Sequence, residues 1–445
     1  MVKENFEAEL LDNVAIKESS EWGTFRDSLK APIHGWFTYP AGFSYKAVEH
    51  TIKRESLVEG IDVIYDPFMG SGTTNLVARS MGINSVGVEA HPFVHKITKA
   101  KLNLNIEVSD VENSIESLKK TLSKTVPPKN LEDFLSKEFP ELILKCFLLE
   151  TLFELLVIRN AIKKLKQSEE VKSFLNTALV CVLRDVSIAA TGWPYIAPNK
   201  IKITSLSKKG AETYFALALK MCNDLQKVKK SLPAIETTHR AYLGDSRKTQ
   251  ELIETNSVDH IFTSPPYLNN FDYADRTRLE MYFMGDANNW GDITDKIRTK
   301  LITSATTQIS RNDERYNFKE EFINDCPEVY EFLSDAVKKL GELRLIKGGK
   351  KSYDLLTVGY FNDLYDILKE NQRVLKPGKK ALYILGDSAP YGVHIPTDVL
   401  IGEIGKCVGF TDFKIDVLRV RGGKWANNPQ RHSVMLRESI VTLFN

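Results

Sequence analysis

Short apolar runs that end in polar or glycine-containing turns predict buried strands in two separate parts of the chain. Residues 62–66 form one such run, which leads into a glycine-containing loop and then a helical pattern over residues 75–80. Residues 85–89 form a second strand, and the run that begins at Val258 forms a third. Strands that alternate with helices in this way predict an α/β fold with a mostly parallel sheet.

Leucine-rich helical patterns replace the strand signal between about residues 105 and 233. They are clearest over residues 131–139, 141–165 and 170–188. The most hydrophobic window, residues 141–157, is interrupted by charged residues at helical spacing, which indicates a buried amphipathic helix rather than a membrane span. The chain therefore carries a helical insertion between its second and third core strands.

The loop after the first strand allows a ligand to approach the backbone closely. Gly70 and Gly72 lack Cβ atoms, and the helix amino terminus behind them favours a negative group. A P-loop would have a lysine where Thr73 stands, and a dinucleotide loop would have a third glycine that is missing here. These residues leave the ligand open. Glu89, at the end of the second strand, is a candidate acceptor for ribose hydroxyls.

The third strand runs directly into residues 264–267 (SPPY), a rigid turn that ends in an aromatic ring. Proline fixes φ and has no amide hydrogen, so carbonyl oxygens near the turn stay available as acceptors. Beside the flat face of Tyr267, such acceptors suit a planar base with an exocyclic amino group. Taken alone, the tetrapeptide fits an ordinary proline turn equally well.

Two motifs together carry a family resemblance. Residues 66–73 (DPFMGSGT) and 263–267 (TSPPY) resemble the paired signature of S-adenosylmethionine-dependent amino-methyltransferases that act on DNA bases, especially the N4-cytosine type. The resemblance extends over residues 30–104, 238–285 and 355–445. It implies a Rossmann-like methyltransferase core, with a mixed, mostly parallel seven-stranded sheet and a large helical insertion. It also implies S-adenosylmethionine as the cofactor and DNA as the substrate.

The resemblance also implies roles for individual residues. Residues 37–44 resemble the segment that closes over the cofactor's methionine moiety, and residues 244–246 resemble the acidic turn that meets its adenine. The cofactor-binding residues expected on this basis are Phe37, Tyr39, Asp66, Phe68, Gly70, Ser71, Gly72, Thr73, Glu89 and Asp245. The expected catalytic residues are Ser264, Pro265, Pro266 and Tyr267, which would position a flipped base for direct methyl transfer.

Five further residues are candidates for binding the substrate. Asn269, Asp272 and Tyr273 follow the catalytic turn and either line the base pocket or cap the start of a helix. Lys200 and Lys202 follow an aromatic stretch and either track DNA phosphates or form a solvated charged face. A basic segment near the carboxyl terminus, residues 419–425, is a third candidate DNA contact or a hinge packed by Trp425.

The residues leave the choice of methylated base open between cytosine and adenine. Ser264 favours cytosine, because aspartate or asparagine is more usual at this position in adenine enzymes. The cofactor loop precedes the catalytic loop here, whereas many cytosine-type relatives have the reverse order. Adenine N6 is therefore the alternative, followed by an RNA base, a small molecule, or a non-catalytic nucleic-acid-binding scaffold.

We expect five segments along the chain. They are the amino-terminal segment and cofactor-binding half of the core (1–104), the helical insertion (105–235), the core strands with the catalytic loop (236–285), a second insertion (286–353) and the carboxyl-terminal part of the core (354–445). Either insertion is a candidate for reading the target sequence.

Composition adds limits to this picture. The net charge of +2 over 445 residues excludes a histone-like binder, so any DNA affinity comes from local basic clusters. The five cysteines show no spacing that suits zinc, and we expect no metal. The first residues lack the order of a signal peptide, so we expect a cytoplasmic, prokaryotic protein without membrane association. A separately encoded restriction or defence enzyme is an expected partner.

Overall fold

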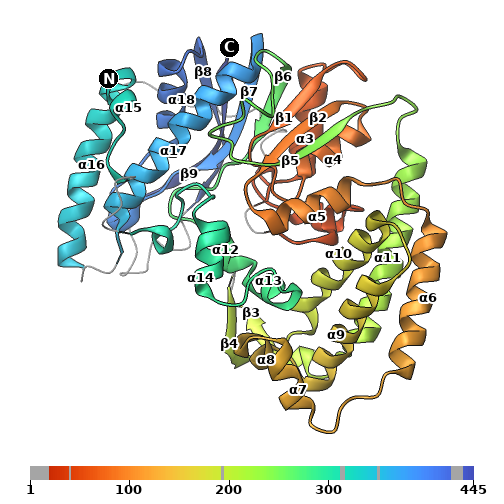
Figure 1. The fold of residues 1–445 in the computed structure, drawn as a ribbon. Helices are drawn as coiled ribbons and strands as arrows, with labels where there is room; N and C mark the ends of the chain where they lie inside the picture. Colours follow the sequence, from red (N-terminus) through yellow and green to blue (C-terminus); the bar gives the residue numbers. More distant parts are fainter. Residues whose placement is uncertain (1–19, 40–41, 192–194, 311–315, 348–350, 422–433) are drawn as a thin grey trace.

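The computed structural model describes residues 20–39, 42–191, 195–310, 316–347, 351–421 and 434–445. Figure 1 shows a central sheet with helices on both sides, and a mainly helical body that extends from one end of it. Among the described residues, no helix is long and apolar enough to cross a membrane.

The central sheet has seven strands in the order β5-β2-β1-β6-β7-β9-β8. Four neighbouring pairs are parallel, whereas β9 runs antiparallel to both β7 and β8. The strands are β1 (Val63–Asp66), β2 (Asn84–Glu89), β5 (His239–Leu243), β6 (Val258–Thr263), β7 (Leu375–Gly386), β8 (Asp412–Arg421) and β9 (Leu436–Phe444). This confirms the expected Rossmann-like methyltransferase sheet, mostly parallel and seven-stranded.

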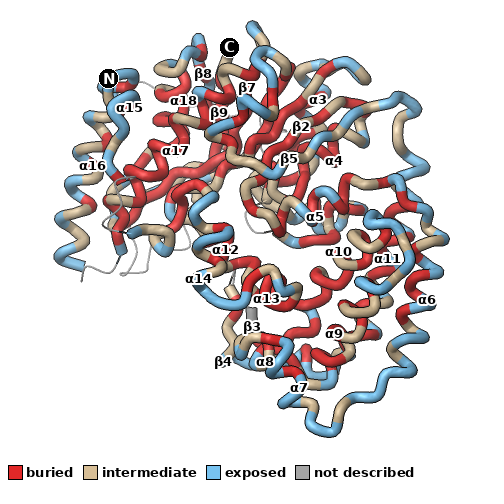
Figure 2. The backbone as a smooth tube through the Cα atoms, in the orientation of Figure 1, coloured by how far each residue is buried: buried red, intermediate tan, exposed pale blue. Residues whose placement is uncertain are grey.

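The centre of the sheet is buried on both faces, which explains why its strands are apolar without alternation. Every residue of β6 is buried. Ile64 and Phe262 pack in one cluster with α3 (Tyr45–Arg54) and α4 (Thr73–Ser80). Their neighbours Tyr65 and Ile261 point the other way, into a cluster with helices α17 (Tyr353–Val374) and α18 (Thr397–Cys407). Figure 2 shows this buried backbone through the sheet and α17.

The amino-terminal segment and the first half of the core complete this framework. Helix α2 (Arg26–Lys30) and the turn η1 (His34–Trp36) precede α3, and α5 (Pro92–Leu102) follows β2. The sequence-based strands at residues 62–66, 85–89 and 258 onward all agree with strands of the structure to within a residue at either end.

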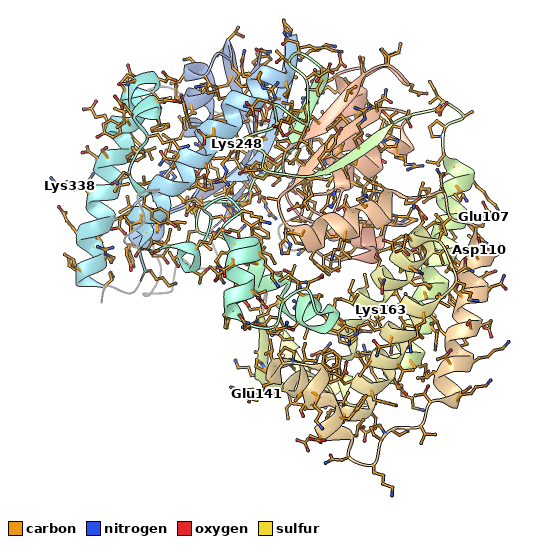
Figure 3. The ribbon with its side chains drawn as sticks, in the orientation of Figure 1. Glu107, Asp110, Glu141, Lys163, Lys248 and Lys338 are labelled. Carbon is orange, nitrogen blue, oxygen red and sulfur yellow. The ribbon has the colours of Figure 1, made fainter. Side chains whose placement is uncertain are left out.

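The helical insertion lies between β2 and β5, as expected. Its helices are α6 (Val108–Lys124), α7 (Leu131–Glu138), α8 (Glu141–Cys146), α9 (Leu149–Lys164), α10 (Glu169–Val186) and α11 (Gly210–Ser231). They enclose a hydrophobic cluster that also includes Trp36 of the amino-terminal segment and Phe93 of α5. Charged side chains such as Glu141 and Lys163 point outward from this body (Figure 3).

Two details of the insertion differ from the sequence-based prediction. Residues 141–165 are not one helix, because Phe147 and Leu148 are extended and separate α8 from α9. The Phe147 side chain turns into the insertion core, where only 2% of it is exposed. The aromatic stretch before Lys200, for which no strands were predicted, falls partly in a hairpin of β3 (Ala189–Thr191) with β4 (Ile196–Ile201), followed by the turn η2 (Ile203–Ser205). Residues 192–194 lie outside the described residues.

The segment after the catalytic strand leaves the sheet and joins the insertion. Leu279, Met281 and Phe283 pack in the same cluster as the insertion helices. The elements here are α12 (Tyr273–Arg276), α13 (Arg278–Met284), α14 (Trp290–Ile293), the π-helix η3 (Thr294–Arg298) and the turn η4 (Thr306–Gln308). Then α15 (Glu320–Asp325) and α16 (Pro327–Ile346) return to the core, and the turn η6 (Pro390–Gly392) follows β7. The expected five-segment division stays a prediction.

Close packing of α18 on the sheet yields a test of this fold. A Cβ on Gly402 would overlap the ring of Phe413 on β8, whereas a Cβ on Gly341 of α16 would meet nothing closer than 3.7 Å. Gly402→Ala should lower the free energy of unfolding by about 1–3 kcal/mol. Gly341→Ala is the matched control and should raise it by about 0.5–1 kcal/mol. Urea unfolding measures both, and equal effects would contradict the described packing.

Candidate active site

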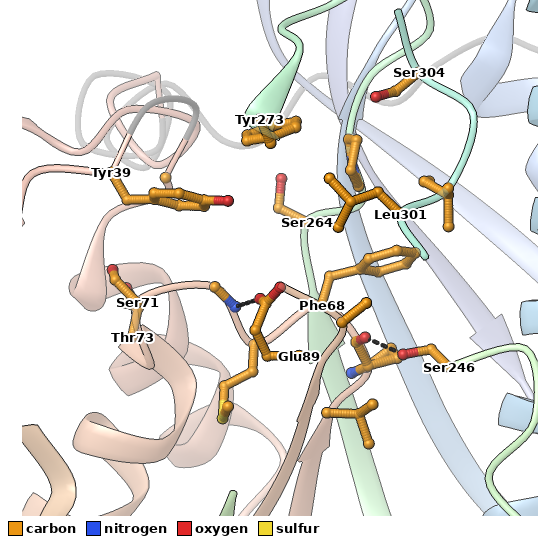
Figure 4. Close-up of a pocket in the computed structure, with 18 of the residues that line it drawn as sticks. Tyr39, Phe68, Ser71, Thr73, Glu89, Ser246, Ser264, Tyr273, Leu301 and Ser304 are labelled. Carbon is orange, nitrogen blue, oxygen red and sulfur yellow. Dashed lines mark hydrogen bonds between the residues drawn. The ribbon is translucent and has the colours of Figure 1, made fainter. Parts of the chain in front are cut away.

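A cavity of about 830 Å³, partly open to solvent, lies at the carboxyl ends of the central strands. Ligands of α/β sheets bind at this edge. Nine of the expected cofactor or catalytic residues line it: Tyr39, Phe68, Gly70, Ser71, Thr73, Glu89, Asp245, Ser264 and Pro266. Tyr273, a substrate-binding candidate, lines it as well. Figure 4 shows side chains from both motifs facing one another across it.

The glycine loop passes directly from β1 into α4. Gly70 and Gly72 have φ values of +50° and +83°, in the left-handed region that favours glycine. Gly72 is the amino-terminal cap of α4, and a Cβ there would lie 2.6 Å from the Thr98 methyl. The Gly70 carbonyl accepts a hydrogen bond from the Thr98 hydroxyl at 2.6 Å. The loop is therefore held in one conformation.

Glu89 connects the end of β2 to the glycine loop. Its carboxylate accepts hydrogen bonds from the backbone N–H groups of Gly70 and His91, both at 2.8 Å. Burial raises the pKa of Glu89 to about 7. The side chain is 8% exposed and lines the cavity (Figure 4).

Asp66 does not line the cavity. It is fully buried, and its carboxylate accepts hydrogen bonds from Phe68 N, Thr74 Oγ1 and Thr263 Oγ1 at 3.0, 2.7 and 2.6 Å. Burial raises the pKa of Asp66 to about 6. Its position ties the glycine loop and α4 to the end of the catalytic strand.

Of the remaining expected cofactor residues, Phe37 lies behind the cavity wall and Asp245 lines the cavity. Phe37 is buried behind Tyr39, with the ring centroids 6.3 Å apart, and does not line the cavity. Asp245 lines it together with Ser246, and its carboxylate accepts hydrogen bonds from the backbone N–H and the guanidinium of Arg247 at 2.8–3.0 Å. The Ser246 hydroxyl donates to the Pro67 carbonyl, which holds this turn against the glycine loop.

The catalytic turn contributes Ser264 and Pro266 to the cavity, and Pro265 is buried beside them. Tyr267 does not line the cavity. Its hydroxyl donates to Glu438 at 3.0 Å, and the Arg421 guanidinium lies 5.4 Å from its ring centroid. Glu438 is in turn paired with Arg419.

The substrate-binding candidates are not all brought together. Tyr273 lines the cavity, with its ring 5.6 Å from that of Tyr39. Asn269 is exposed, with φ at +60° in the turn before α12. Lys200 is exposed on β4, and the Lys202 amino group donates to the Arg184 carbonyl at 3.3 Å. Neither lysine lines the cavity.

Asp272 has the capping geometry that the sequence left as an alternative. It is 1% exposed, and its Oδ1 accepts hydrogen bonds from the N–H groups of Ala274 and Asp275 at the start of α12. Its Oδ2 pairs with Arg298 at 2.6 Å and accepts from Thr307 at 2.8 Å. Its lone pairs are used within the protein, and α12 in turn holds Tyr273 at the cavity.

One wall of the cavity was not predicted from the sequence. It consists of Lys300, Leu301, Ile302 and Ser304, from the segment after η3. This segment has neither glycine nor a motif, and only the fold brings it back to the sheet edge. Gly42 and Phe43, which belong to the cofactor-side segment 37–44, also line the cavity.

The sheet order, the glycine loop and the proline–tyrosine turn at adjacent strand ends define a Rossmann-like methyltransferase. A family model described as "DNA methylase" matches residues 11–100. This match and the relatives described below support a DNA amino-methyltransferase of the N4/N6 family. This confirms the resemblance carried by the two motifs.

Several relatives align over almost the whole chain. Type II methyltransferase M.BsoBI of Geobacillus stearothermophilus is 26% identical over 92% of this chain and 85% of its own length. M.AvaI of Anabaena variabilis is 25% identical over 92% and 85%, and M.MvaI of Kocuria varians is 23% identical over 89% and 87%. Among solved structures, the rRNA methyltransferase aviRa of Streptomyces viridochromogenes has a TM-score of 0.30 and 9% identity, covering 94% of this chain and 92% of its own.

The contacts of Asp272 predict a structural effect. Asp272→Asn keeps an oxygen for the helix cap but removes the charge that Arg298 faces. It should lower the free energy of unfolding by about 3–5 kcal/mol, as expected when a buried ion pair loses one partner. The exposed neighbour Asp295 supplies the control, because Asp295→Asn should change stability by less than about 0.5 kcal/mol. Urea unfolding compares them, and a neutral Asp272→Asn would return Asp272 to the substrate-binding candidates.

Proposed function

We propose that this protein transfers a methyl group from S-adenosylmethionine to the exocyclic N4 of cytosine in DNA. The observation that carries the proposal is a single cavity lined by the glycine loop, Glu89 and Asp245 on one side and by Ser264 and Pro266 on the other. A nucleoside cofactor and a planar base both fit the chemistry of these walls, and transfer between them requires that they meet in one space.

The residues present suit the cofactor. Glu89 and Asp245 place carboxylates at two points, where the first would accept from ribose hydroxyls and the second would meet the adenine. Gly70 removes a side chain from the path of the ligand, since even the nearest side chain atoms, from Tyr39, are 3.5 Å from where its Cβ would be. Phe68 adds an apolar surface. When bound, S-adenosylmethionine supplies a methyl group already activated on a sulfonium.

The catalytic turn would act by positioning. An exocyclic amino nitrogen shares its lone pair with the ring, and it becomes nucleophilic as it pyramidalises. The Ser264 hydroxyl and the carbonyl oxygens of the Ser264–Pro265 stretch would accept its N–H groups and favour that geometry. The rigid prolines keep the nitrogen in line with the methyl group at a near-attack distance of about 3–3.5 Å.

The base must leave the duplex to reach this cavity. Unstacking and unpairing cost a few kcal/mol, which stacking on aromatic side chains offsets in part. Tyr273 and Tyr39 line the cavity, whereas Tyr267 follows the cavity-lining Ser264 and Pro266 in the same turn. We assign Tyr267 to stacking on the flipped base, with its hydroxyl anchored by Glu438.

We assign DNA binding to surfaces outside the cavity. Trp290 is 46% exposed, with the guanidinium groups of Arg278 and Arg298 at 4.2 and 5.1 Å from its ring. Lys200 and Lys202 lie on and after β4, in the helical insertion. Both the insertion and the segment around α14 are candidates for reading the target sequence. The relatives are named Type II methyltransferases, so a separately encoded restriction enzyme is the partner we propose.

Adenine N6 is the second candidate, favoured by one observation. The glycine loop precedes the catalytic loop in the chain, an order that is less usual among cytosine-type relatives. Ser264 in place of an acidic or amide residue favours cytosine.

Product analysis tests the proposal and separates the candidates. The purified protein is incubated with S-adenosylmethionine and unmethylated genomic DNA, which is digested to nucleosides and analysed by mass spectrometry. N4-methyldeoxycytidine is the expected product. N6-methyldeoxyadenosine would keep the chemistry and overturn the base assignment, and the absence of both would overturn DNA methylation under these conditions. The same assay on RNA then tests the remaining enzymatic alternative.

The stacking role of Tyr267 predicts different methyl-transfer rates for two substitutions at this position. Tyr267→Ala should lower the rate of methyl transfer roughly tenfold to a hundredfold, because one aromatic–base stack contributes about 1–3 kcal/mol. Tyr267→Phe keeps the ring and loses only the hydrogen bond to Glu438, so its rate should stay within a few-fold of wild type. Cofactor affinity, measured by calorimetry, should be similar in all three proteins. A normal rate in Tyr267→Ala would remove Tyr267 from the site.

A further inference from the structure

We propose that Lys101 is a positioning residue for the cofactor, whose buried ammonium group holds the glycine loop from behind and favours the cofactor's carboxylate. This inference rests on the proposed function, because it takes S-adenosylmethionine as the ligand of the cavity. Lys101 belongs to neither sequence motif, and it does not line the cavity.

The geometry places Lys101 directly behind the loop. It lies at the end of α5, is fully buried, and its amino group donates a hydrogen bond to the Ser71 carbonyl at 2.6 Å. A second hydrogen bond, at 3.4 Å, goes to the His34 carbonyl. Since His34 begins the segment that leads to Tyr39, one ammonium group joins α5, the glycine loop and the cofactor-side segment.

Thr98 provides a second contact from the same face of α5. It lies three residues before Lys101, so the two side chains are neighbours on the helix. Thr98 holds the Gly70 carbonyl and Lys101 holds the Ser71 carbonyl. In the trans peptide between Gly70 and Ser71, the Ser71 N–H points opposite to the Gly70 carbonyl that Thr98 holds, so it points away from α5. The helix thereby orients a backbone donor of the loop toward the ligand side.

The charge of Lys101 is not compensated within the protein. No carboxylate in the described part of the chain forms an ion pair with it. Its titratable neighbours are neutral, since burial lowers the pKa of His34 to about 3 and raises the pKa of Cys181 to about 12. Glu89 lies on the other side of the loop, against Gly70 N. Burial accordingly lowers the pKa of Lys101 to about 7. A carboxylate bound at the loop would offset this unpaired charge.

Lys101 and Glu89 should make cofactor affinity fall at opposite ends of the pH range. A bound carboxylate favours protonated Lys101, so affinity should fall as the pH rises through about 7 and binding should take up protons. Ionised Glu89 accepts hydrogen bonds from ribose hydroxyls more strongly than the protonated form, so affinity should also fall as the pH drops through about 7. Affinity should therefore be greatest near neutral pH. Its fall at higher pH, the alkaline limb, is due to Lys101, and its fall at lower pH, the acid limb, is due to Glu89.

Calorimetry of S-adenosylmethionine binding between pH 6 and 8.5, in buffers of different ionisation enthalpy, tests the inference. Lys101→Met should weaken binding about 10–100-fold at pH 6.5, the range for a charge-assisted hydrogen bond, and should lose the alkaline limb and its proton uptake. Glu89→Gln should lose the acid limb and keep the alkaline one. The ligand's own amino group titrates in every variant, so differences between variants isolate the protein groups.

Three matched variants separate charge from structure. Thr98→Val removes the neighbouring loop contact without changing any charge, so it should weaken binding and keep the wild-type pH profile. Lys101→Arg keeps a charge that does not titrate in this range, so its alkaline limb should vanish while part of the affinity returns. Lys99→Met alters an exposed lysine of the same helix and should behave as wild type.

The outcomes distinguish this inference from the proposed function. An unchanged alkaline limb in Lys101→Met or in Lys101→Arg would overturn the role of Lys101. If Lys101→Met does not fold, as circular dichroism would report, Lys101→Arg and proton uptake by the wild-type protein decide the question. Wild-type protein that binds no S-adenosylmethionine at any pH would instead overturn the proposed function.

Discussion

The buried carboxylate of Asp66 is the interaction on which the site depends. It accepts hydrogen bonds from Phe68 in the glycine loop, from Thr74 in the first turn of α4 and from Thr263 at the end of β6. An unpaired carboxylate would be too costly in this apolar centre, and three directed hydrogen bonds make it tolerable. Because the group is costly unless all three donors are present, the two loops that form the cavity are fixed relative to each other.

This link also explains how distant parts of the sequence form one site. Asp66 and Thr263 are 197 residues apart in the chain, yet β1 and β6 are parallel neighbours in the sheet. Parallel strands have their carboxyl ends at the same edge, so the loops that follow them must meet. The helical insertion is accommodated because it leaves the sheet after α5 and returns at β5, the edge strand, without disturbing the central pairing.

Features set by local chemistry could be predicted from the sequence, and those set by packing could not. The strands, the glycine loop and the SPPY turn follow from apolar runs, positive φ at Gly70 and Gly72, and the constraints of proline. The cavity wall around Leu301 has no such signal, because the long chain path through α12–η3 brings it there. Asp66 was expected at the cofactor, but a buried carboxylate and an exposed one look alike in sequence. The break at Phe147 likewise depends on where its ring packs.

The helical insertion is connected to the cavity by buried charges rather than by a flexible linker. Glu280 is 1% exposed and lies between Arg184 of insertion helix α10, at 2.5 Å, and Arg276 of α12, at 3.3 Å. Arg276 in turn donates to the carbonyl of Thr38, next to Tyr39 in the cavity wall. Removing one member of such a group leaves a charge unpaired, at a cost of about 3–5 kcal/mol, so the arrangement resists independent movement of its parts. A partner bound to the insertion would therefore have a fixed position relative to the cavity. Transfer to a single base requires such a fixed position.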